Sequence, residues 1–215
     1  SKFPPIGDQG QFGTCVGWAT AYNVKTAING IDNNYSTNDL RDTRNQFSPK
    51  DLFLSIDNNL KGANCNGTGF DNALDLIQNR GVATLATVPY TNLGNCDKSQ
   101  VQSSWTAEAA SNKIKYYRKV DPKVTTLKEQ LANNVPIILG AKLSDNFMSW
   151  NSDEVISSNT TYNNTGQHAY HALAILGYDD DKGPNGAFKV VNSWGQTWGS
   201  KGYIWVRSET SKQWH

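Results

Sequence analysis

Helix-like and strand-like patterns are separated along this chain, and the separation limits the fold classes open to it. Helix-like segments come first, at residues 14–28, 48–58 and 69–81, and one more lies at 124–134. Short apolar or alternating runs bounded by Gly, Pro, Asn and Asp, a pattern typical of strands, follow at residues 136–143, 171–179, 187–195 and 202–208. A helical half followed by a mainly β half predicts an α+β fold rather than alternating βαβ units. The pattern changes between residues 96 and 120, which suggests two lobes with a cleft between them.

The helix-like segments have recognisable ends. Thr14 is the expected N-cap of the first helix, so that Cys15 takes the first helical position, and the run "NGID" is the expected stop. The second segment begins with Ser48 as its expected cap, followed by a Pro, and Asp51 lies near the positive end of the helix dipole. Gly81 is expected to close the third helix.

Charge and hydropathy exclude several classes of protein. The chain has 215 residues with 20 Lys plus Arg against 19 Asp plus Glu, and no run of like charge indicates attraction to nucleic acid or to an anionic membrane. No apolar stretch approaches the roughly 20 residues that span a bilayer, and no signal-like segment follows Ser1. We therefore expect a mature soluble domain whose targeting segment or propeptide has been removed or left out. At this length no disulfide framework is needed for folding.

Cys15 has two interpretations. A thiol in the first turn of a helix experiences the helix dipole and the unpaired amide groups there, and both favour thiolate over thiol. The alternative is a buried structural cysteine. A nucleophile would need a base, and the chain offers His168, His171 and His215. His171 begins an apolar strand and is either a satisfied core residue or a rigidly mounted base, whereas "HAYH" lacks the spacing and the Glu of a zinc-protease motif, so we expect no metal.

Asn192 is the third candidate residue. It follows two valines at the expected end of a strand and precedes two tryptophans in a Gly-rich turn, within "VVNSWGQTWGSKGYIWV". Asn is a common turn residue, which would account for it without any function. Alternatively, its amide accepts a hydrogen bond from an imidazole N–H and is shielded from water by an indole.

Taken together, these stretches resemble a known family. "QGQFGTC" beginning at Gln9, "HALAILGY" and "NSWGQTWGSKGYIWV" are similar, in this order, to blocks of the papain-like cysteine peptidases, family C1. The gap from Cys15 to His171 slightly exceeds the roughly 130–150 residues typical of the family. "FSPKDLFLS", "CNGTGFDNALDLIQNRGVATLATVPY" and "LKEQLANNVPIILGA" resemble further family segments, so the resemblance covers nearly the whole chain.

The resemblance implies a papain-like two-lobe fold and a set of catalytic roles. A mainly helical lobe, approximately residues 10–105, would carry the nucleophile Cys15. A β-barrel-like lobe, approximately residues 106–215 with the N-terminal segment, would carry His171 as acid and base and Asn192 as its orienting group. Gln9 and the backbone N–H of Cys15 would form the oxyanion hole. The active-site cleft would lie between the lobes of this single catalytic domain, 1–215, and no cofactor is implied.

The resemblance also implies a substrate-binding set. "CNGTGF" resembles the family's glycine wall, on which an extended substrate pairs its backbone like an added strand. The pocket for P2, the second residue upstream of the scissile bond, would be apolar. Trp194 would cover the contact between Asn and His, and Trp198 would line the leaving-group side. The expected substrate-binding residues are Gly67, Thr68, Gly69, Phe70, Ala169, Tyr170, Ala172, Trp194 and Trp198.

The sequence departs from the family pattern around the nucleophile. The family usually has a second Cys three residues before it and a Trp directly after it, where this chain has Phe12 and Val16. Cys65 and Cys96 occupy two family positions whose usual partners are missing. We expect them to pair with each other, which would stabilise by about 3–4 kcal/mol on the loop-entropy model, the alternative being two buried thiols. These departures, and a chain that ends soon after "GYIWVRS", resemble a bacterial branch of the family.

The expected function is a cysteine endopeptidase that cleaves peptide bonds through a thioester acyl-enzyme and prefers an apolar P2 residue. The alternatives are a processing exopeptidase or transpeptidase on the same fold and, from another class, a non-catalytic peptide-binding module on a degenerate peptidase fold. Expected partners are protein or peptide substrates and its own inhibitory propeptide. Nucleic acid and membrane insertion are not expected, and the protein is expected to be a monomer. The expected disulfide and the habit of the family predict a secreted, periplasmic or cell-surface location.

Overall fold

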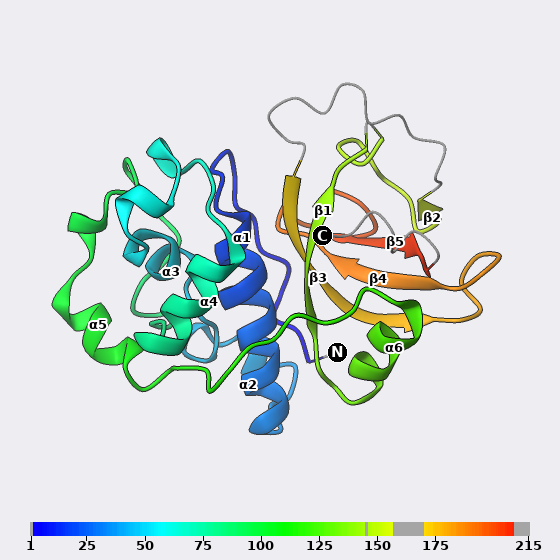
Figure 1. Ribbon diagram of the computed structural model, residues 1–215, viewed down its shortest axis with the longest axis horizontal. Helices are drawn as coiled ribbons and strands as arrows, with labels where there is room; N and C mark the ends of the chain where they lie inside the picture. Colours follow the sequence, from blue (N-terminus) through cyan, green and yellow to red (C-terminus); the bar gives the residue numbers. More distant parts are fainter. Residues whose placement is uncertain (1, 145, 157–169, 209–215) are drawn as a thin grey trace. The chain divides into compact units, whose positions relative to one another are not determined.

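The computed structural model describes residues 2–144, 146–156 and 170–208, and the chain divides into two compact units. Unit 1 comprises Ser1–Pro5 and Gln9–Arg118, and unit 2 comprises Ile6–Asp8 and Lys119–His215. The chain thus passes between the units after residues 5, 8 and 118. The helices α1 to α5 belong to unit 1, and the sheet belongs to unit 2 together with helix α6 (Figure 1). This segregation confirms the predicted α+β class.

A single long helix dominates unit 1. It consists of α1 (Cys15–Gly17), a π-helical stretch η1 (Trp18–Lys25) and α2 (Thr26–Asp32) without a break. The helix runs four residues past its predicted end at Ile28 and ends at Asp32, the last residue of the predicted stop "NGID", because Gly30 continues the helix. A Cβ at Gly30 would lie 2.8 Å from the Leu40 side chain, so the glycine is there to let Leu40 pack against the helix backbone. This close approach outweighs the weak helix propensity of Gly.

The next two predicted helices of unit 1 are confirmed. In α3 (Pro49–Ser55), the Ser48 side chain accepts a hydrogen bond from the Asp51 amide, as the cap prediction requires. Helix α4 (Phe70–Asn79) is followed by Gly81 at φ +90. Helix α5 (Ser103–Ala109) was not predicted. None of the helices in the described residues is long and apolar enough to cross a membrane. The short helical turns are η2 (Asp39–Arg41), η3 (Thr43–Asn45), η4 (Asn58–Leu60), η5 (Ala63–Cys65) and η6 (Lys98–Gln100).

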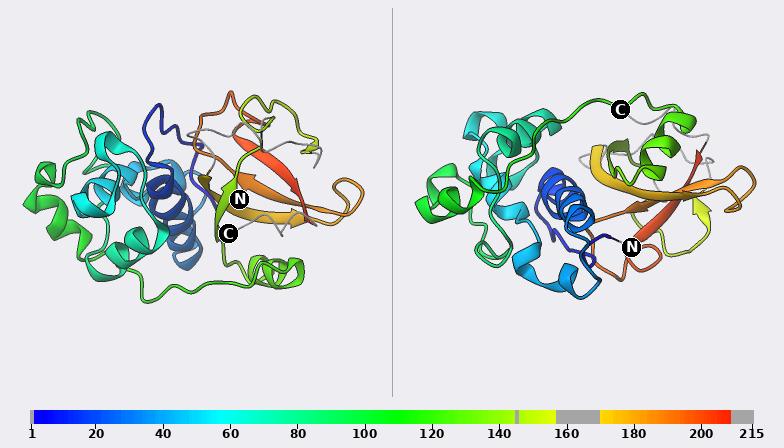
Figure 2. Two further views of the ribbon diagram at one scale, coloured as in Figure 1. Left: turned by 45° about the horizontal axis from the view of Figure 1, so that its top comes forward. Right: turned by 90° about the horizontal axis from the view of Figure 1, so that it is seen from below.

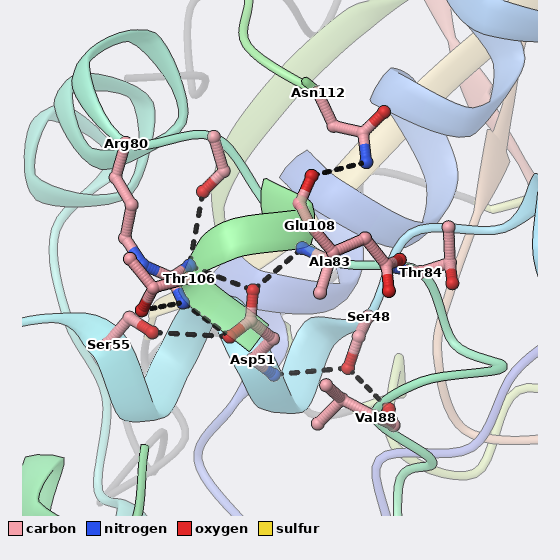
Figure 3. Close-up of polar contacts among 11 residues, drawn as sticks. Ser48, Asp51, Ser55, Arg80, Ala83, Thr84, Val88, Thr106, Glu108 and Asn112 are labelled. Carbon is pink, nitrogen blue, oxygen red and sulfur yellow. Dashed lines mark hydrogen bonds and ion pairs between the residues drawn. The ribbon is translucent and has the colours of Figure 1, made fainter. Parts of the chain in front are cut away.

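A buried carboxylate links the helices of unit 1. Asp51 on α3 is fully buried and accepts two hydrogen bonds of 2.9 Å from the guanidinium of Arg80, which follows α4. It also accepts hydrogen bonds from the Ala83 amide at 2.7 Å and from Ser55 at 3.3 Å (Figure 3). Because both oxygens have donors, the charge of Asp51 is compensated inside the protein.

Unit 2 is built on a five-stranded sheet in the order β1-β3-β4-β5-β2. Its strands are β1 (Ile137–Lys142), β2 (Val155–Ile156), β3 (Tyr170–Asp179), β4 (Ala187–Val191) and β5 (Tyr203–Arg207). The pairs β1–β3, β3–β4 and β4–β5 are antiparallel, whereas β2 joins β5 in parallel. Four of the five strands match predicted runs, and the two-residue β2 was not predicted. Helix α6 (Val124–Ala132), which was predicted, contacts β1 and β3 (Figure 2).

The core of unit 2 includes the apolar side chains of β3. Leu173 and Ile175 are buried in one cluster with Phe188 of β4 and Ile204 of β5. His171 lies two residues before Leu173 and is buried, as the strand pattern predicted.

The N-terminal segment Ile6–Asp8 belongs to this unit. Asp8 forms a β-bridge with Trp194, and the Gly195 amide donates to the Gly7 carbonyl at 3.0 Å. A Cβ at Gly202 would lie 2.5 Å from the side chain of Ile6. The segment therefore packs against the turn that carries the two tryptophans.

Candidate active site

Cys15 lies at the first position of the long helix, as predicted, and it is partly exposed. It is the one cysteine outside the disulfide. Thr14 is the N-cap residue, as predicted, but its side chain does not cap the helix. Thr14 has φ −98 and ψ 18, makes no side-chain cap and instead hydrogen-bonds its hydroxyl to that of Tyr90 at 2.6 Å.

Gln9 lies six residues before Cys15 in the same unit and is buried. Its side-chain Nε2 donates to the Phe12 carbonyl at 2.8 Å, and its backbone carbonyl accepts from the Tyr90 hydroxyl at 3.0 Å. A carboxamide nitrogen has two hydrogens, so the Phe12 contact uses one of them and fixes the direction of the other.

The predicted glycine wall runs beside the nucleophile loop, within unit 1. Gly13 forms a parallel β-bridge with Asn66. A Cβ at Gly13 would lie 2.8 Å from both the Cys65 carbonyl and the Gly67 amide, so only glycine permits this approach. Gly67 itself has φ +85 and is partly exposed.

The other wall residues lie in the same segment. The Thr68 hydroxyl donates to the Leu60 carbonyl at 2.9 Å, Gly69 is exposed, and Phe70 is half-buried at the start of α4. The structure therefore brings the residues of "CNGTGF" beside the loop that leads to Cys15. Their role in binding substrate stays a prediction.

The predicted disulfide between Cys65 and Cys96 is present, with a Cα–Cα distance of 5.2 Å. Both residues are fully or almost fully buried, in a cluster with Phe53 and Leu93. Both also have positive φ, 64 and 58, a region that non-glycine residues seldom adopt. The bridge anchors the segment against which Gly13 packs.

His171 and Asn192 form a buried hydrogen bond in unit 2. The Nε2 of His171 lies 2.7 Å from Oδ1 of Asn192, and the Ser193 amide donates to the same oxygen at 2.8 Å. A carbonyl oxygen only accepts, so His171 carries a proton on Nε2 and its Nδ1 faces elsewhere. Asn192 Nδ2 is buried without a hydrogen-bond partner among the described residues.

Aromatic rings surround this pair. Trp194 lies against the imidazole of His171, with ring centroids 4.8 Å apart and planes inclined at 33°. Phe147 packs against three rings, with centroids 4.9 Å from Trp198, 5.5 Å from Trp194 and 6.4 Å from His171. The Phe147 carbonyl also accepts from the Trp198 indole at 3.0 Å. Water is therefore kept from one side of the imidazole, and the ring is held in one orientation.

Two further predicted substrate residues lie on β3. Tyr170 is exposed, with 73% of its surface accessible, whereas Ala172 is buried. Ala169, His168 and His215 lie outside the described residues. Across residues 2–144, 146–156 and 170–208, no group of three or more His, Cys, Asp or Glu side chains is arranged to hold a metal ion.

Sequence reasoning missed Tyr90 and Phe147. Tyr90 follows a Pro in a stretch quoted only for its resemblance, and nothing local marks its hydroxyl as a partner for residues about 80 positions earlier. Phe147 lies in an irregular segment between β1 and β2. Only the fold brings either residue to its partners.

Comparisons with known proteins give the family of this chain. The family model described as papain family cysteine protease matches residues 1–215. Vignain from Vigna mungo is 29% identical over 212 residues, covering 97% of this chain and 52% of the relative. Cathepsin K from Gallus gallus is 30% identical over 206 residues, covering 93% of this chain and 54% of the relative. The chain spans about half the length of the curated relatives it matches.

Solved structures share the fold. Xylellain, a cysteine protease from Xylella fastidiosa, superposes with a TM-score of 0.76 at 22% identity, over 96% of this chain and 77% of that chain. The bromelain protease from Ananas comosus in complex with the E64 inhibitor gives 0.68 at 23% identity, over 96% and 85%. At these identities the likeness carries the fold alone, and the family model carries the membership. The chain therefore belongs to the papain family of cysteine proteases.

Proposed function

We propose that this protein is a cysteine endopeptidase in which Cys15 of unit 1 and His171 of unit 2 act as a pair. The observation that carries the proposal is the hydrogen bond of 2.7 Å between His171 and Asn192. This bond keeps a proton on Nε2 of the imidazole. The other ring nitrogen, Nδ1, is then the atom that can exchange a proton with a thiol. Membership in the family and the position of Cys15 at a helix start support the same assignment.

In the acylation step, the thiolate of Cys15 attacks the carbonyl carbon of the scissile peptide bond, and a C–S bond forms. The developing oxyanion is stabilised by the Cys15 backbone N–H and by the side-chain Nε2 of Gln9, whose position the Phe12 contact fixes. The C–N bond then breaks as protonated His171 transfers its proton to the leaving amine. The products of this step are a thioester and the released amine.

In the deacylation step, neutral His171 takes a proton from water, and the resulting hydroxide attacks the thioester carbonyl. The C–S bond breaks, the carboxylic acid leaves, and the thiolate–imidazolium pair is restored. Asn192 orients the imidazole through both steps without adding charge. The rings of Phe147 and Trp194 exclude water from the hydrogen bond between His171 and Asn192 and so strengthen it.

We extend the proposal to substrates and location. An extended peptide would pair its backbone with Gly67 and Gly69, and Phe70, Ala169 and Ala172 favour an apolar P2 residue. The disulfide between Cys65 and Cys96 supports export to an oxidising compartment, which is the secreted, periplasmic or cell-surface location predicted above.

The test is alkylation of Cys15 with iodoacetamide from pH 3 to 9, read by intact mass. The chain has three cysteines and two are bridged, so a single added label reports Cys15, and Cys15→Ser is the control that should take none. We expect fast labelling well below the ordinary thiol pKa of about 8.5. We expect His171→Ala to lose the fast labelling at acidic pH. Its rate of hydrolysis of a fluorogenic peptide with Leu at P2 should fall as well.

Slow labelling that rises only near pH 8 in both proteins, without hydrolysis of the peptide, would contradict the proposal. That result would favour a peptide-binding module on the same fold. Equal hydrolysis of peptides with Leu and with Lys at P2 would remove the apolar preference and leave the peptidase assignment intact.

A further inference from the structure

We propose that Tyr90 is a positioning residue whose hydroxyl clamps the loop from Gln9 to Cys15 and so holds the oxyanion-stabilising groups in place. The inference rests on the proposed function, because it concerns the same loop. It assigns to Tyr90 a role in setting the rate of the chemical step, without contact with the reacting atoms.

The hydrogen bonds of Tyr90 reach both ends of the loop. Its hydroxyl lies 3.0 Å from the Gln9 carbonyl and 2.6 Å from the Thr14 hydroxyl. A phenol has one hydrogen, and a carbonyl can only accept, so Tyr90 donates to Gln9 and Thr14 donates to Tyr90. The hydroxyl oxygen of Tyr90 thus connects Gln9, whose side-chain amide would stabilise the oxyanion, to Thr14, which precedes Cys15.

Tyr90 is itself held in place by its neighbours in unit 1. Its ring packs edge-on against Trp18 of the long helix, with centroids 4.8 Å apart at 69°. Trp18 is 4% exposed. Two positions before Tyr90, the Val88 carbonyl accepts from the Ser48 hydroxyl at 2.7 Å, and the Val88 amide bonds to the Thr84 carbonyl at 3.0 Å. The hydroxyl is therefore presented to the loop by an anchored segment.

The clamp adds to the anchor that Gly13 gives the middle of the loop through its β-bridge with Asn66. The disulfide joins Cys65 to Cys96 and includes no residue of the loop. The backbone carbonyl of Gln9 is fixed by Tyr90. The side-chain Nε2 of Gln9 is fixed by its hydrogen bond of 2.8 Å to the Phe12 carbonyl. Groups that stabilise a developing charge act best when their positions are set before the reaction, because no free energy is then spent on orienting them. Loss of the hydroxyl should therefore slow the chemical step more than it weakens substrate binding.

The experiment compares Tyr90→Phe with the matched control Tyr22→Phe. Tyr22 also packs edge-on against Trp18 at 4.8 Å, and its hydroxyl also donates to a backbone carbonyl, that of Pro5 at 2.9 Å, outside the loop. Each variant loses one hydroxyl and keeps its ring. For Tyr90→Phe we expect kcat on a fluorogenic peptide amide to fall about tenfold with KM nearly unchanged, since displacing an oxyanion donor should cost less than deleting one.

Two further measurements separate positioning from general damage. A peptide aldehyde forms a tetrahedral adduct that uses the oxyanion groups, so its affinity should fall by about the same factor as kcat. Alkylation by iodoacetamide forms no oxyanion, so its rate at Cys15 should stay at the wild-type value. Equal kcat losses in Tyr90→Phe and Tyr22→Phe would overturn the proposal. A fall in alkylation rate that matches the fall in kcat would also overturn it, because the effect would then lie on the thiol.

Failure of the proposed function would look different. Wild-type protein that neither hydrolyses the peptide nor labels rapidly at acidic pH would contradict the peptidase assignment and, with it, the catalytic importance of Tyr90. Hydrogen exchange would still test the clamp itself, since Tyr90→Phe should speed exchange of the amides between residues 10 and 15 and Tyr22→Phe should not. Unchanged exchange in both variants would show that Tyr90 does not order the loop.

Discussion

The two units hold their candidate catalytic residues by different means. In unit 1, the loop before Cys15 is fixed by separate hydrogen bonds from Gln9, Thr14 and Tyr90. In unit 2, the imidazole of His171 hydrogen-bonds to Asn192 and packs against the rings of Phe147 and Trp194. The loop before Cys15 thus relies on directional polar contacts, whereas His171 combines its contact with Asn192 with apolar packing.

The difference determines how each unit should respond to substitution. Removing one partner of a buried polar contact leaves the other partner unsatisfied, and this penalty is added to the lost bond. Removing part of a packed ring costs contact area and a small cavity, which neighbours partly fill. Unit 1 should therefore be the more sensitive to conservative changes.

The largest effect is expected from Arg80→Met in unit 1. The variant leaves the fully buried Asp51 without its cation, which should lower the free energy of unfolding by about 3–5 kcal/mol in urea denaturation. Arg44→Met is the matched control, because Arg44 also pairs with an aspartate, Asp42, but is 80% exposed. Its cost should stay below about 1 kcal/mol. Similar losses in both variants would show that burial of Asp51 does not set the cost.

The next effect is expected from the double substitution Cys65→Ser and Cys96→Ser. Opening the disulfide should lower the free energy of unfolding by about 3–4 kcal/mol, because the unfolded chain regains the freedom of the closed loop. Cys15→Ser is the control, since it removes a thiol without opening a loop. The comparison is made by urea denaturation under non-reducing conditions. A double variant as stable as the control would mean that the bridge contributes nothing to the stability of unit 1.

A smaller effect is expected from Phe147→Leu in unit 2. The substitution nearly conserves volume, and it should cost about 1–2 kcal/mol in stability. Phe188→Leu is the matched control, because Phe188 is fully buried in the same core and pairs in the sheet with Tyr178, seven residues along β3 from His171. We expect kcat to fall only for Phe147→Leu, measured on the peptide amide. Equal kcat in the two variants would show that the rings do not orient His171.

Lys25→Met should give the smallest change, and in the opposite direction. Burial lowers the pKa of Lys25 to about 8, although Asp32 partly offsets this and the ammonium lies 3.8 Å from the centre of the Phe47 ring. Because the folded pKa is below the unfolded value of about 10.4, the unfolded chain binds more protons between these two values, and stability rises with pH there. Below pH 8 the whole penalty is present.

Removing Lys25 should therefore raise the free energy of unfolding at pH 7 by at most about 1 kcal/mol and flatten its rise between pH 8 and 10.4. The control is Lys113→Met, an exposed lysine of the same unit. If the free energy of unfolding of Lys25→Met rises between pH 8 and 10.4 as much as that of the wild type, another group causes the rise.

The fold elements that could be predicted are those whose signals are local. Helix α3 follows from Ser48 and the Pro after it, because a cap and a fixed φ act over four residues. The strands of unit 2 follow from their own apolar runs. The end of the long helix could not be predicted, because Gly30 is explained only by Leu40 packing against it. The two-residue β2 depends entirely on its pairing with β5.

The candidate site divides in the same way. Cys15, His171 and Asn192 stand in motifs that can be read along the chain, and the structure places the last two in hydrogen-bond contact. The disulfide between Cys65 and Cys96 was expected from the family pattern and is present. The hydrogen bonds of Tyr90 have no motif. Thr14 is the predicted N-cap residue, but the partner of its hydroxyl lies 76 positions away and leaves no local signal.

The position of Ile6–Asp8 in unit 2 has a consequence for how the protein is made. These residues precede their partners Trp194, Gly195 and Gly202 by more than 180 positions, so synthesis delivers them long before those partners. The residues of unit 1 up to Arg118 can meet their partners earlier in synthesis, whereas unit 2 has to wait for its last turn before the early segment can dock. Residues 6–8 therefore wait for these partners until the chain has been made past Gly202, and only then can the segment dock.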